Sequence, residues 1–156
     1  MQNLNDCRFV NISDDVILGN NVVIFEFTNL YGCTIGDDTR IGTFVEIQRG
    51  ATIGQECRIQ SHTFICAGVS IGNRVFVGHG VMFINDRHPS VAQAQRGEWK
   101  MEEIYVKDQA SIGTGALIMG GVTIGKGATI GAGAVVTRDV RDKETVVGIP
   151  ARRLRK

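Results

Sequence analysis

The 156-residue chain is short of proline, of aromatic residues and of net charge, and each shortage excludes a class of protein. It has 2 prolines, 6% aromatic residues and a formal net charge of +1. Near-neutral charge gives no global field that would attract a nucleic acid or an anionic membrane surface. No run approaches the roughly eighteen apolar residues of a membrane span, and the first residues lack a signal segment. We therefore expect a cytoplasmic protein that binds neither nucleic acid nor membrane.

Cysteine is also scarce. The four cysteines, Cys7, Cys33, Cys57 and Cys66, lack the paired CxxC spacing of zinc knuckles and redox sites. Cys57 stands at a position that the repeat described below otherwise fills with Thr, Val or Ala. We therefore expect Cys57 to be a small buried thiol rather than a reactive one.

Glycine is abundant, with 20 residues set among many isoleucines and valines. A disordered glycine-rich chain would contain more proline and fewer β-branched residues. Frequent glycines between β-branched residues instead predict many short strands joined by tight turns.

The strongest pattern is an aliphatic or aromatic residue at every sixth position. The first run comprises Ile35, Ile41, Ile47, Ile53, Ile59, Ile65, Ile71, Val77 and Phe83, and the second comprises Val106, Ile112, Ile118, Ile124, Ile130 and Val136. Glycine often follows this residue, and a small or branched residue stands four places after it. A period of six is neither helical nor a simple alternation. It predicts a short strand and a turn, three of which close a triangular coil of about eighteen residues around one narrow core.

This pattern resembles the hexapeptide repeat, and the resemblance covers roughly residues 18–136. It implies an all-β fold, a left-handed parallel β-helix, whose handedness departs from the usual crossover rule and is taken from the family alone. An earlier register, "LGNNVVIFEFTNLYGCT", is one residue out of step with Ile35. We therefore expect a bulge or an adjusted corner near Tyr31–Gly32.

We expect one domain over 1–156. Its parts are an N-terminal start (1–17), the β-helix (18–137), an ejected loop (about 84–105) and a basic C-terminal tail (138–156) that is placed to cap the last coil. The resemblance implies a homotrimer with sites between subunits, and a monomer with solvated sides is the alternative.

The repeat stops in "GHGVMFINDRHPS" and resumes a little over twenty residues later. A loop of this length inside a compact repeat is usually functional. It carries polar residues and the only tryptophan, Trp99, and therefore suits a sugar-like ligand. His79, at the edge of the interruption, should share one column with Ser61 and Thr114 on successive coils. Its glycine neighbours allow close approach by a ligand, so His79 is either a general base or a solvated turn residue.

The segments "VFVGHGVMFINDRHP", "IGTGALIMGGVTIGKGATIGAGAVVTRDV" and "VVGIPARR" resemble the nucleotide-sugar N-acetyltransferases of the hexapeptide family. The similarity is greatest to enzymes that acetylate dTDP-3-amino-3,6-dideoxyhexoses, and a related group acts on UDP-linked amino sugars. This resemblance implies that acetyl-coenzyme A is the donor, that no metal takes part, and that the product serves surface polysaccharide or glycan biosynthesis.

The resemblance also implies roles for individual residues. His79 would be the general base; the alternative is that the amine enters already neutral and the thiolate takes its proton later. A backbone N–H near Thr114 would bind the oxyanion. The sugar pocket would use Asn85, Asp86, Arg87 and Trp99. The coenzyme would lie along Thr114, Gly115, Gly120, Gly121, Lys126, Ala132, Gly133, Arg138 and Arg152. Corner-forming glycines and a solvated basic tail are the alternatives for this last set.

Three rival functions follow from the same fold. Zinc-dependent carbonic anhydrases need three converging histidines, whereas His62, His79 and His88 occupy different column positions. O-acetyltransferases share the fold and the coenzyme. A non-catalytic scaffold would not bind acetyl-coenzyme A. The sequence leaves open the sugar configuration, the position of the amine and the choice between dTDP and UDP.

Overall fold

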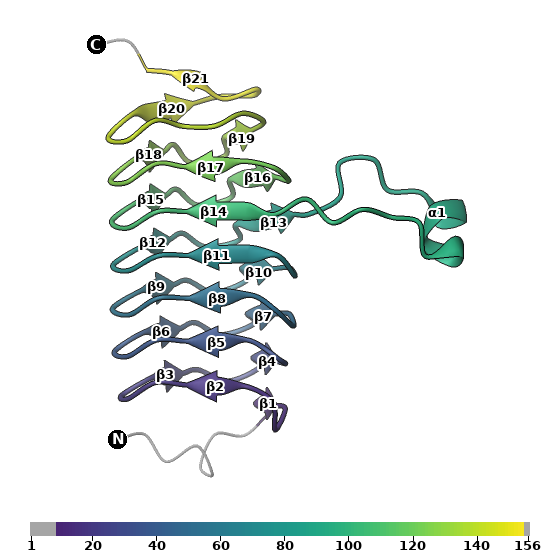
Figure 1. The fold of residues 1–156 in the computed structure, drawn as a ribbon. Coiled ribbons are helices and arrows are strands. Elements are labelled where there is room, and N and C mark those ends of the chain that lie inside the picture. Colours follow the sequence, from purple (N-terminus) through teal and green to yellow (C-terminus); the bar gives the residue numbers. More distant parts are fainter. Residues whose placement is uncertain (1–8, 155–156) are drawn as a thin grey trace.

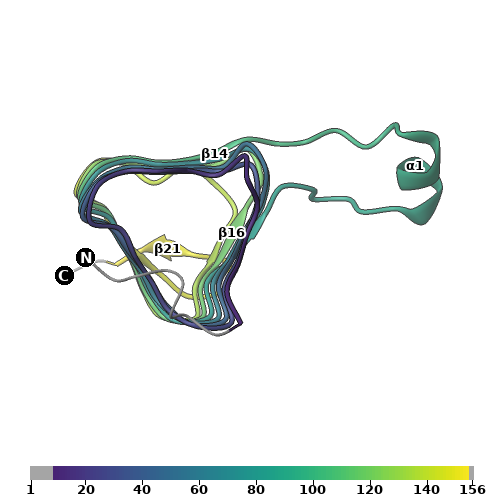
Figure 2. The ribbon, with the colours of Figure 1, turned by 90° about the horizontal axis from the view of Figure 1, so that it is seen from below.

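The structure is a computed structural model that describes residues 9–154. Stacked coils of very short strands form a triangular prism, and a single loop projects from it (Figures 1 and 2). The expected all-β fold is confirmed. Within the described residues no helix is long and apolar enough to cross a membrane.

Each of the first six coils contributes one strand to each of three sheets, and the last coil contributes strands to sheets A and C. Sheet A contains β1 (Asn11–Ile12), β4 (Asn29–Leu30), β7 (Glu46–Ile47), β10 (Phe64–Ile65), β13 (Met82–Ile84), β16 (Leu117–Met119) and β19 (Val135–Val136). Sheet B contains β2 (Ile17–Leu18), β5 (Thr34–Ile35), β8 (Thr52–Ile53), β11 (Val69–Ile71), β14 (Ile104–Val106) and β17 (Thr123–Ile124). Sheet C contains β3 (Val23–Ile24), β6 (Arg40–Ile41), β9 (Arg58–Ile59), β12 (Phe76–Val77), β15 (Ser111–Ile112), β18 (Thr129–Ile130), β20 (Thr145–Val147) and β21 (Arg152–Arg153).

The coil is left-handed. The arrows of sheet B in Figure 1 point to the left, and Figure 2 shows the prism from its N-terminal end with β14 along the top edge. Seen from that end, the chain runs counterclockwise as it recedes from the viewer, which defines a left-handed turn. The handedness implied by the resemblance is therefore confirmed.

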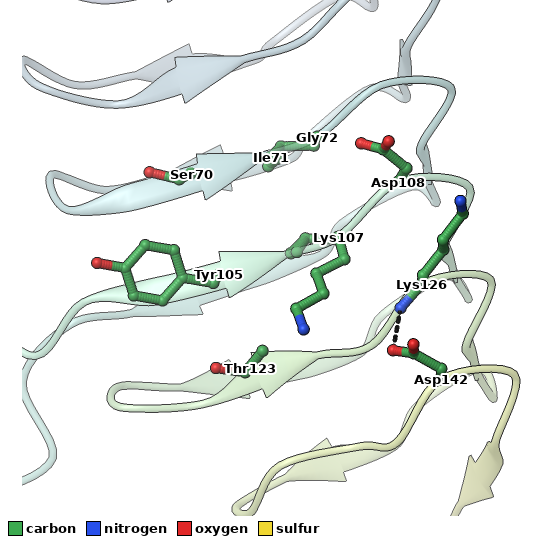
Figure 3. Close-up of a pocket in the computed structure, with 10 residues that line it drawn as sticks. Ser70, Ile71, Gly72, Tyr105, Lys107, Asp108, Thr123, Lys126 and Asp142 are labelled. Carbon is green, nitrogen blue, oxygen red and sulfur yellow. Dashed lines mark hydrogen bonds between the residues drawn. The ribbon is translucent and has the colours of Figure 1, made fainter.

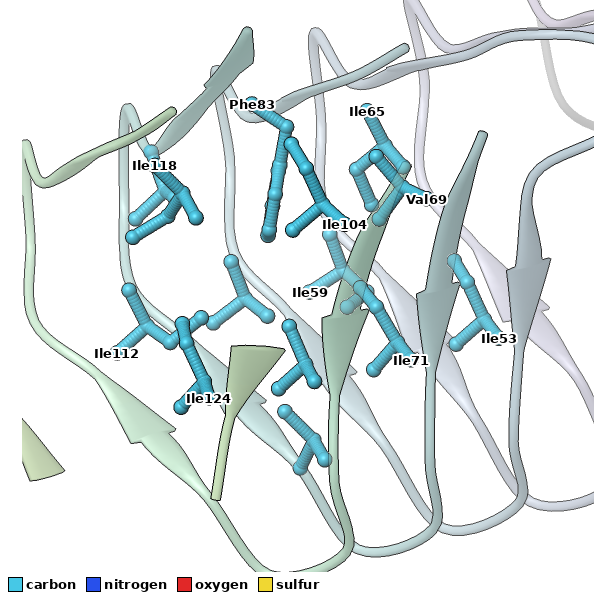
Figure 4. Packing of buried hydrophobic residues seen from close by; sticks show 14 of the residues in the cluster. Ile53, Ile59, Ile65, Val69, Ile71, Phe83, Ile104, Ile112, Ile118 and Ile124 are labelled. Carbon is cyan, nitrogen blue, oxygen red and sulfur yellow. The ribbon is translucent and has the colours of Figure 1, made fainter. Parts of the chain in front are cut away.

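The core is the column of sixth residues. Ile59, Ile65, Ile112, Ile118 and Ile124 are at most 1% exposed, and their side chains fill the inside of the triangle (Figure 4). Successive coils align these residues directly, as in the pairing of Val77 with both Ile59 and Ile112. The six-residue period therefore specifies both the strands and the direction in which their side chains point.

Three of the cysteines belong to this core. Cys57 is fully buried, as expected, and burial raises the pKa of its thiol. Burial also raises the pKa of the Cys33 and Cys66 thiols to about 11. These thiols stay protonated near neutral pH and act as small apolar side chains. Cys7 lies outside the described residues.

The out-of-step register is absorbed at one corner. The buried residues Leu30 and Ile35 are five positions apart across this corner, whereas the corresponding pair Ile47 and Ile53 is six positions apart. Gly32 has a φ of 55°, and a Cβ there would lie 2.7 Å from Arg49 Cγ. The expected adjustment near Tyr31–Gly32 is therefore a shortened turn and not a bulge.

The boundaries of the loop and of the coils differ from those expected. Strand pairing already begins at Asn11, before the predicted start at residue 18. The loop comprises residues 85–103, because Ile84 pairs with Met119 and Ile104 pairs with Val69. It carries a short helix, α1 (Val91–Arg96), which the six-residue pattern does not predict.

The C-terminal segment covers the end of the prism. Val140 makes an isolated parallel bridge to Ile124, and β20 then extends sheet C. Strand β21 turns back and pairs antiparallel with β20, so that it lies across the last coil (Figure 2). This arrangement removes an open strand edge at that end, as the position of the tail suggested.

Candidate active site

The turns from sheet C to sheet A form the edge that carries His79. We call this edge the His79 corner; it comprises 25–28, 42–45, 60–63, 78–81, 113–116 and 131–134. In each of these turns the third residue after the buried aliphatic residue has a positive φ, between 57° and 70°. The turns therefore repeat one backbone conformation, and equivalent residues lie in columns along the edge.

His79 is held by the serine of the preceding coil. The Oγ atom of Ser61 lies 2.8 Å from His79 Nδ1, and the expected column of Ser61, His79 and Thr114 is confirmed by the strand pairing. When Nδ1–H donates to Ser61 Oγ, the lone pair on Nε2 is left to accept a proton. The His79 side chain is exposed at the corner. The sequence placed Ser61 in this column but gave no sign that it is the orienting partner.

Two backbone N–H groups beside this column have no partner. Within residues 9–154 no hydrogen bond is found for the N–H of Thr114 or of Ala132, and both residues are exposed. The carbonyl oxygens of this column do have partners, because Gly115 N–H donates to His79 O and Gly133 N–H donates to Thr114 O, both at 2.8 Å. A turn that holds its free N–H groups in fixed positions can bind a carbonyl oxygen or an oxyanion.

The glycines of this corner are of two kinds. A Cβ on Gly78 would lie 2.6 Å from Thr114 N, and one on Gly113 would lie 2.5 Å from Ala132 N, so these two glycines permit close stacking of the coils. A Cβ on Gly80, Gly115 or Gly133 would meet nothing within 4 Å. Packing within the chain therefore does not explain Gly80, Gly115 and Gly133. These three glycines leave a surface without side chains along the corner.

Two basic residues line a hollow at the C-terminal end of the prism. The turn after β20 stacks on the coil below, where Val135 N–H donates to Gly148 O at 3.0 Å. Arg138 and Arg152 line a small hollow of about 130 Å³ with Glu144. Three strand spacings of about 4.8 Å separate the coil of His79 from that of Gly148, so the corner offers roughly 14 Å of surface that leads toward the arginines.

Other predicted coenzyme residues lie elsewhere on this chain. Gly120 and Gly121 belong to the turns from sheet A to sheet B, and a Cβ on Gly120 would meet the side chain of Glu102 at 2.6 Å. Lys126 lies on the third corner, where its backbone N–H donates to Asp142 Oδ1 at 2.8 Å. The predicted set is therefore divided among three corners, and only Thr114, Gly115, Ala132 and Gly133 lie beside His79.

Two of the predicted sugar-binding residues hold the root of the loop. Asn85 Nδ2 donates to Ala67 O at 2.9 Å. Arg87 Nε donates to Gly120 O at 2.7 Å and lies 3.0 Å from Glu102 Oε2, and the guanidinium also donates to Thr137 O at 3.3 Å. Within this chain the guanidinium is thus engaged by two carbonyls and one carboxylate, and it fixes where the loop leaves the prism.

The remaining two predicted loop residues differ in position: Asp86 lies at the root, between Asn85 and Arg87, and Trp99 lies farther out. Asp86 Oδ1 accepts a hydrogen bond of 2.9 Å from the backbone N–H of His88. The Trp99 side chain is 44% exposed, and it follows α1 in the outer part of the loop. The loop leaves the prism at the corner between sheets A and B and projects away (Figure 2). Within one chain, its outer part therefore does not cover the His79 corner.

The sequence did not predict a hollow on the outer face of sheet B. It has a volume of about 670 Å³ and lies along β11, β14 and β17. Figure 3 shows Tyr105 and Lys107 projecting over it, with Lys126 and Asp142 at one end. Of the predicted site residues only Lys126 lines it, and it lies on a different face from His79.

The comparisons with known proteins agree with this architecture. The bacterial transferase hexapeptide model (six repeats) matches residues 32–67 and 103–138. Galactoside O-acetyltransferase of Lactococcus lactis is 34% identical over 80 residues, which cover 51% of this chain and 39% of that protein. The chain spans less than half the length of each of the curated relatives that it matches.

Two solved structures cover most of both chains. A variant of AntD, an N-acyltransferase from Bacillus cereus, was solved with dTDP-4-amino-4,6-dideoxyglucose and coenzyme A; it is 25% identical, with a TM-score of 0.75, and the match covers 88% of this chain and 81% of that chain. The hexapeptide-repeat acetyltransferase VCA0836 of Vibrio cholerae, solved with acetyl-coenzyme A, is 27% identical with a TM-score of 0.56, and the match covers 91% and 70%.

The fold and the repeat together define a left-handed β-helix built from hexapeptide repeats. The repeats of this chain are similar to those of the bacterial transferase hexapeptide family over residues 32–67 and 103–138. Its structural neighbours include proteins named as an N-acyltransferase and as acetyltransferases. Within the described residues, no group of three or more histidine, cysteine or acidic side chains is placed to hold a metal ion.

Proposed function

We propose that this protein is an acetyl-coenzyme A-dependent N-acetyltransferase that acts on the amino group of a nucleotide-linked sugar. The His79 corner is the observation that carries the proposal. It combines a histidine oriented by Ser61 with the free N–H of Thr114, and a bare edge leads from both toward the C-terminal end of the prism, where Arg138 and Arg152 line a hollow. Such an edge suits a long, narrow donor that ends in phosphates.

In the reaction, the acetyl thioester lies beside His79 and the pantetheine arm follows Gly115 and Gly133. The neutral amine attacks the thioester carbonyl, and the N–C bond forms while the carbonyl oxygen becomes an oxyanion. The N–H of Thr114 stabilises that oxyanion. Collapse of the intermediate breaks the C–S bond, and coenzyme A leaves as a thiolate. His79 Nε2 accepts the proton of the amine and can return it to the thiolate.

The substrate class is supported by the neighbours and by the loop. AntD binds a dTDP-linked amino sugar and coenzyme A on the same fold. In this chain the loop projects from a different corner and carries the exposed apolar side chains Val91, Trp99 and Met101. We propose that the chain forms a homotrimer in which the loop of one copy covers the His79 corner of the next. Asp86 and Trp99 then contribute to the sugar pocket from the partner copy.

The test measures thiol release from acetyl-coenzyme A with a panel of dTDP- and UDP-linked 3-amino and 4-amino sugars. Wild type should turn over at least one of them. His79→Ala should lower kcat/KM by about a hundredfold, because general base catalysis contributes about that much. Full activity of His79→Ala would assign the proton transfer to another group and leave the substrate class in place.

An O-acetyltransferase is the second candidate, because the similarity to galactoside O-acetyltransferase extends over 51% of this chain. The same assay should therefore include galactosides and serine as hydroxyl acceptors. Turnover of these acceptors but not of amino sugars would overturn the N-acetyltransferase proposal. Absence of turnover, together with absence of acetyl-coenzyme A binding, would indicate a scaffold.

A further inference from the structure

A ladder of aromatic rings occupies the N-terminal half of the His79 corner. Phe27, Phe44 and His62 stand at the third position of successive turns, and Phe9 continues the column. The ring centroids of Phe9 and Phe27 are 5.3 Å apart, those of Phe27 and Phe44 4.9 Å, and those of Phe44 and His62 4.9 Å. The two steps between phenylalanine rings are nearly parallel, and the step from Phe44 to His62 is tilted by 33°.

The ladder ends where the candidate site begins. The next position in the column is Gly80, whose φ of 63° matches the 64° of His62 and the 57° of Phe44. The backbone is therefore the same, and a Cβ on Gly80 would meet nothing within 4 Å. Within residues 9–154, the only ring contact of His62 is the one with Phe44. One face of the His62 ring thus borders an open space the size of one ladder step, beside His79.

The open position is not a requirement of the turn. Phenylalanine occupies the same left-handed position at Phe27 and Phe44, so this turn accepts a bulky residue. A preference for glycine at positive φ would act equally on every coil. The change from rings to glycine falls between His62 and Gly80, next to the one histidine that has an orienting partner. A ligand that needs this space accounts for the change.

We propose that the ring of the acceptor sugar packs on His62 in the place of the missing ladder step. This inference rests on the proposed function. A group one ladder step from His62 is beside His79, so an amine on that ring lies within reach of the Nε2 atom and of the thioester. The nucleobase does not fit this position as well, because the diphosphate would then hold the amine well away from His79.

The contact has a plain physical basis. The face of an aromatic ring is electron-rich, whereas the C–H bonds on one face of a sugar ring carry a slight positive charge. Spacings of about 4.8 Å between coils match the separation of stacked rings. His62 is therefore a positioning residue for the acceptor, and Phe44 supports its ring from the other side.

The first test fills the space. Gly80→Phe should fold, because Phe27 and Phe44 show that this turn carries phenylalanine. It should lower kcat/KM for the amino sugar that wild type uses best by about a hundredfold. Coenzyme A affinity, measured by calorimetry, should stay within about threefold of wild type. The matched control is Gln109→Phe, which introduces the same ring at an equivalent turn position, φ 62°, on another corner and should keep full activity.

The second test changes His62 itself and covers the case in which Gly80→Phe does not fold. His62→Ala should raise KM for the acceptor by roughly threefold to tenfold with KM for acetyl-coenzyme A unchanged, whereas His62→Phe should restore the wild-type value. dTDP alone should bind His62→Ala as tightly as wild type. Weaker dTDP binding would place the nucleobase on His62 and overturn the inference.

The outcomes separate the two proposals. Wild-type acceptor kinetics in Gly80→Phe or in His62→Ala would overturn this inference and leave the acetyltransferase proposal intact. Absence of amino-sugar turnover by wild type would overturn both. A loss of assembly in Gly80→Phe, detected by sedimentation while Gln109→Phe stays assembled, would assign the space to a second copy of the chain and would also overturn the inference.

Discussion

Two corners of the same prism differ in the hydrogen bonding of one backbone group, the N–H at the second position of each turn. Where sheet B turns into sheet C, a side-chain oxygen of the next coil accepts a hydrogen bond from the turn's N–H, at Asn20, Gln55, Asn73 and Lys126. At the His79 corner the equivalent N–H groups of Thr114 and Ala132 have no partner within the described residues. The capped corner satisfies four of these N–H groups with its own side chains, whereas the His79 corner leaves donors available for a ligand.

The side chains of the two corners follow the same division. The capped corner presents Asp37, Asn73, Asp108 and Asp142, which bind the backbone of the coil before them. The His79 corner presents glycine, alanine, threonine and histidine from residue 78 onward. The same repeat thus forms one corner whose N–H groups are bound by Asp and Asn side chains and one corner whose N–H groups are accessible. The two corners differ in only one or two residues of each turn.

The largest effect should come from removal of the free N–H. Thr114→Pro deletes this donor, and proline is favoured at the position before a left-handed residue in such a turn. We expect kcat to fall by about a hundredfold or more, the usual effect of losing one oxyanion donor. Thr43→Pro makes the same change in the equivalent turn before Phe44, φ 57°, and should keep wild-type kcat. Equal losses in both variants would show that the proline acts through the fold.

A smaller effect should come from the partner of His79. Ser61→Ala removes the oxygen that lies 2.8 Å from His79 Nδ1, and kcat should fall by roughly tenfold, because the ring loses its orientation. Ser61→Thr retains the hydroxyl group and should recover most of the activity. In the double variant with His79→Ala, Ser61→Ala should cause no further loss. Additive losses would mean that Ser61 acts independently of His79.

The smallest effect should come from the capped corner and should appear in stability alone. Asp142→Ala removes the acceptor of the Lys126 N–H, 2.8 Å away. Loss of one such bond costs about 1 kcal/mol, which corresponds to a fall in Tm of roughly 2–4 °C. Thermal unfolding measures this fall, and thiol release should stay at the wild-type rate. A large loss of activity would move the site toward the capped corner and the hollow over sheet B.

Much of this architecture could be predicted from the sequence. The six-residue period alone determines which side chains enter the core, so the coils and the column of Ser61, His79 and Thr114 follow from counting. Period and register do not specify side-chain contacts, and therefore the bond between Ser61 and His79 could not be predicted.

Other features depend on contacts that the sequence does not encode in a visible pattern. The sequence predicts that Arg87 binds a ligand. In the structure its guanidinium donates to the backbone carbonyls of Gly120 and Thr137, and no sequence pattern identifies these carbonyls as its acceptors. The direction of the loop depends on those same contacts. The aromatic ladder could not be predicted for a different reason. Phe27, Phe44 and His62 are one whole coil apart, so they do not recur at every sixth residue, and positive φ values are unusual for such residues.

The most direct test is the dissociation constant of coenzyme A for Gly133→Phe beside that for Gln109→Phe. Both variants place a ring at the third position of a turn, and φ is 66° at Gly133 and 62° at Gln109. If the His79 corner is the donor site, the ring at 133 should block it and weaken binding by about a hundredfold, while the ring at 109 should leave binding unchanged. Wild-type affinity in Gly133→Phe, with the fold intact, would show that the coenzyme does not lie along this corner.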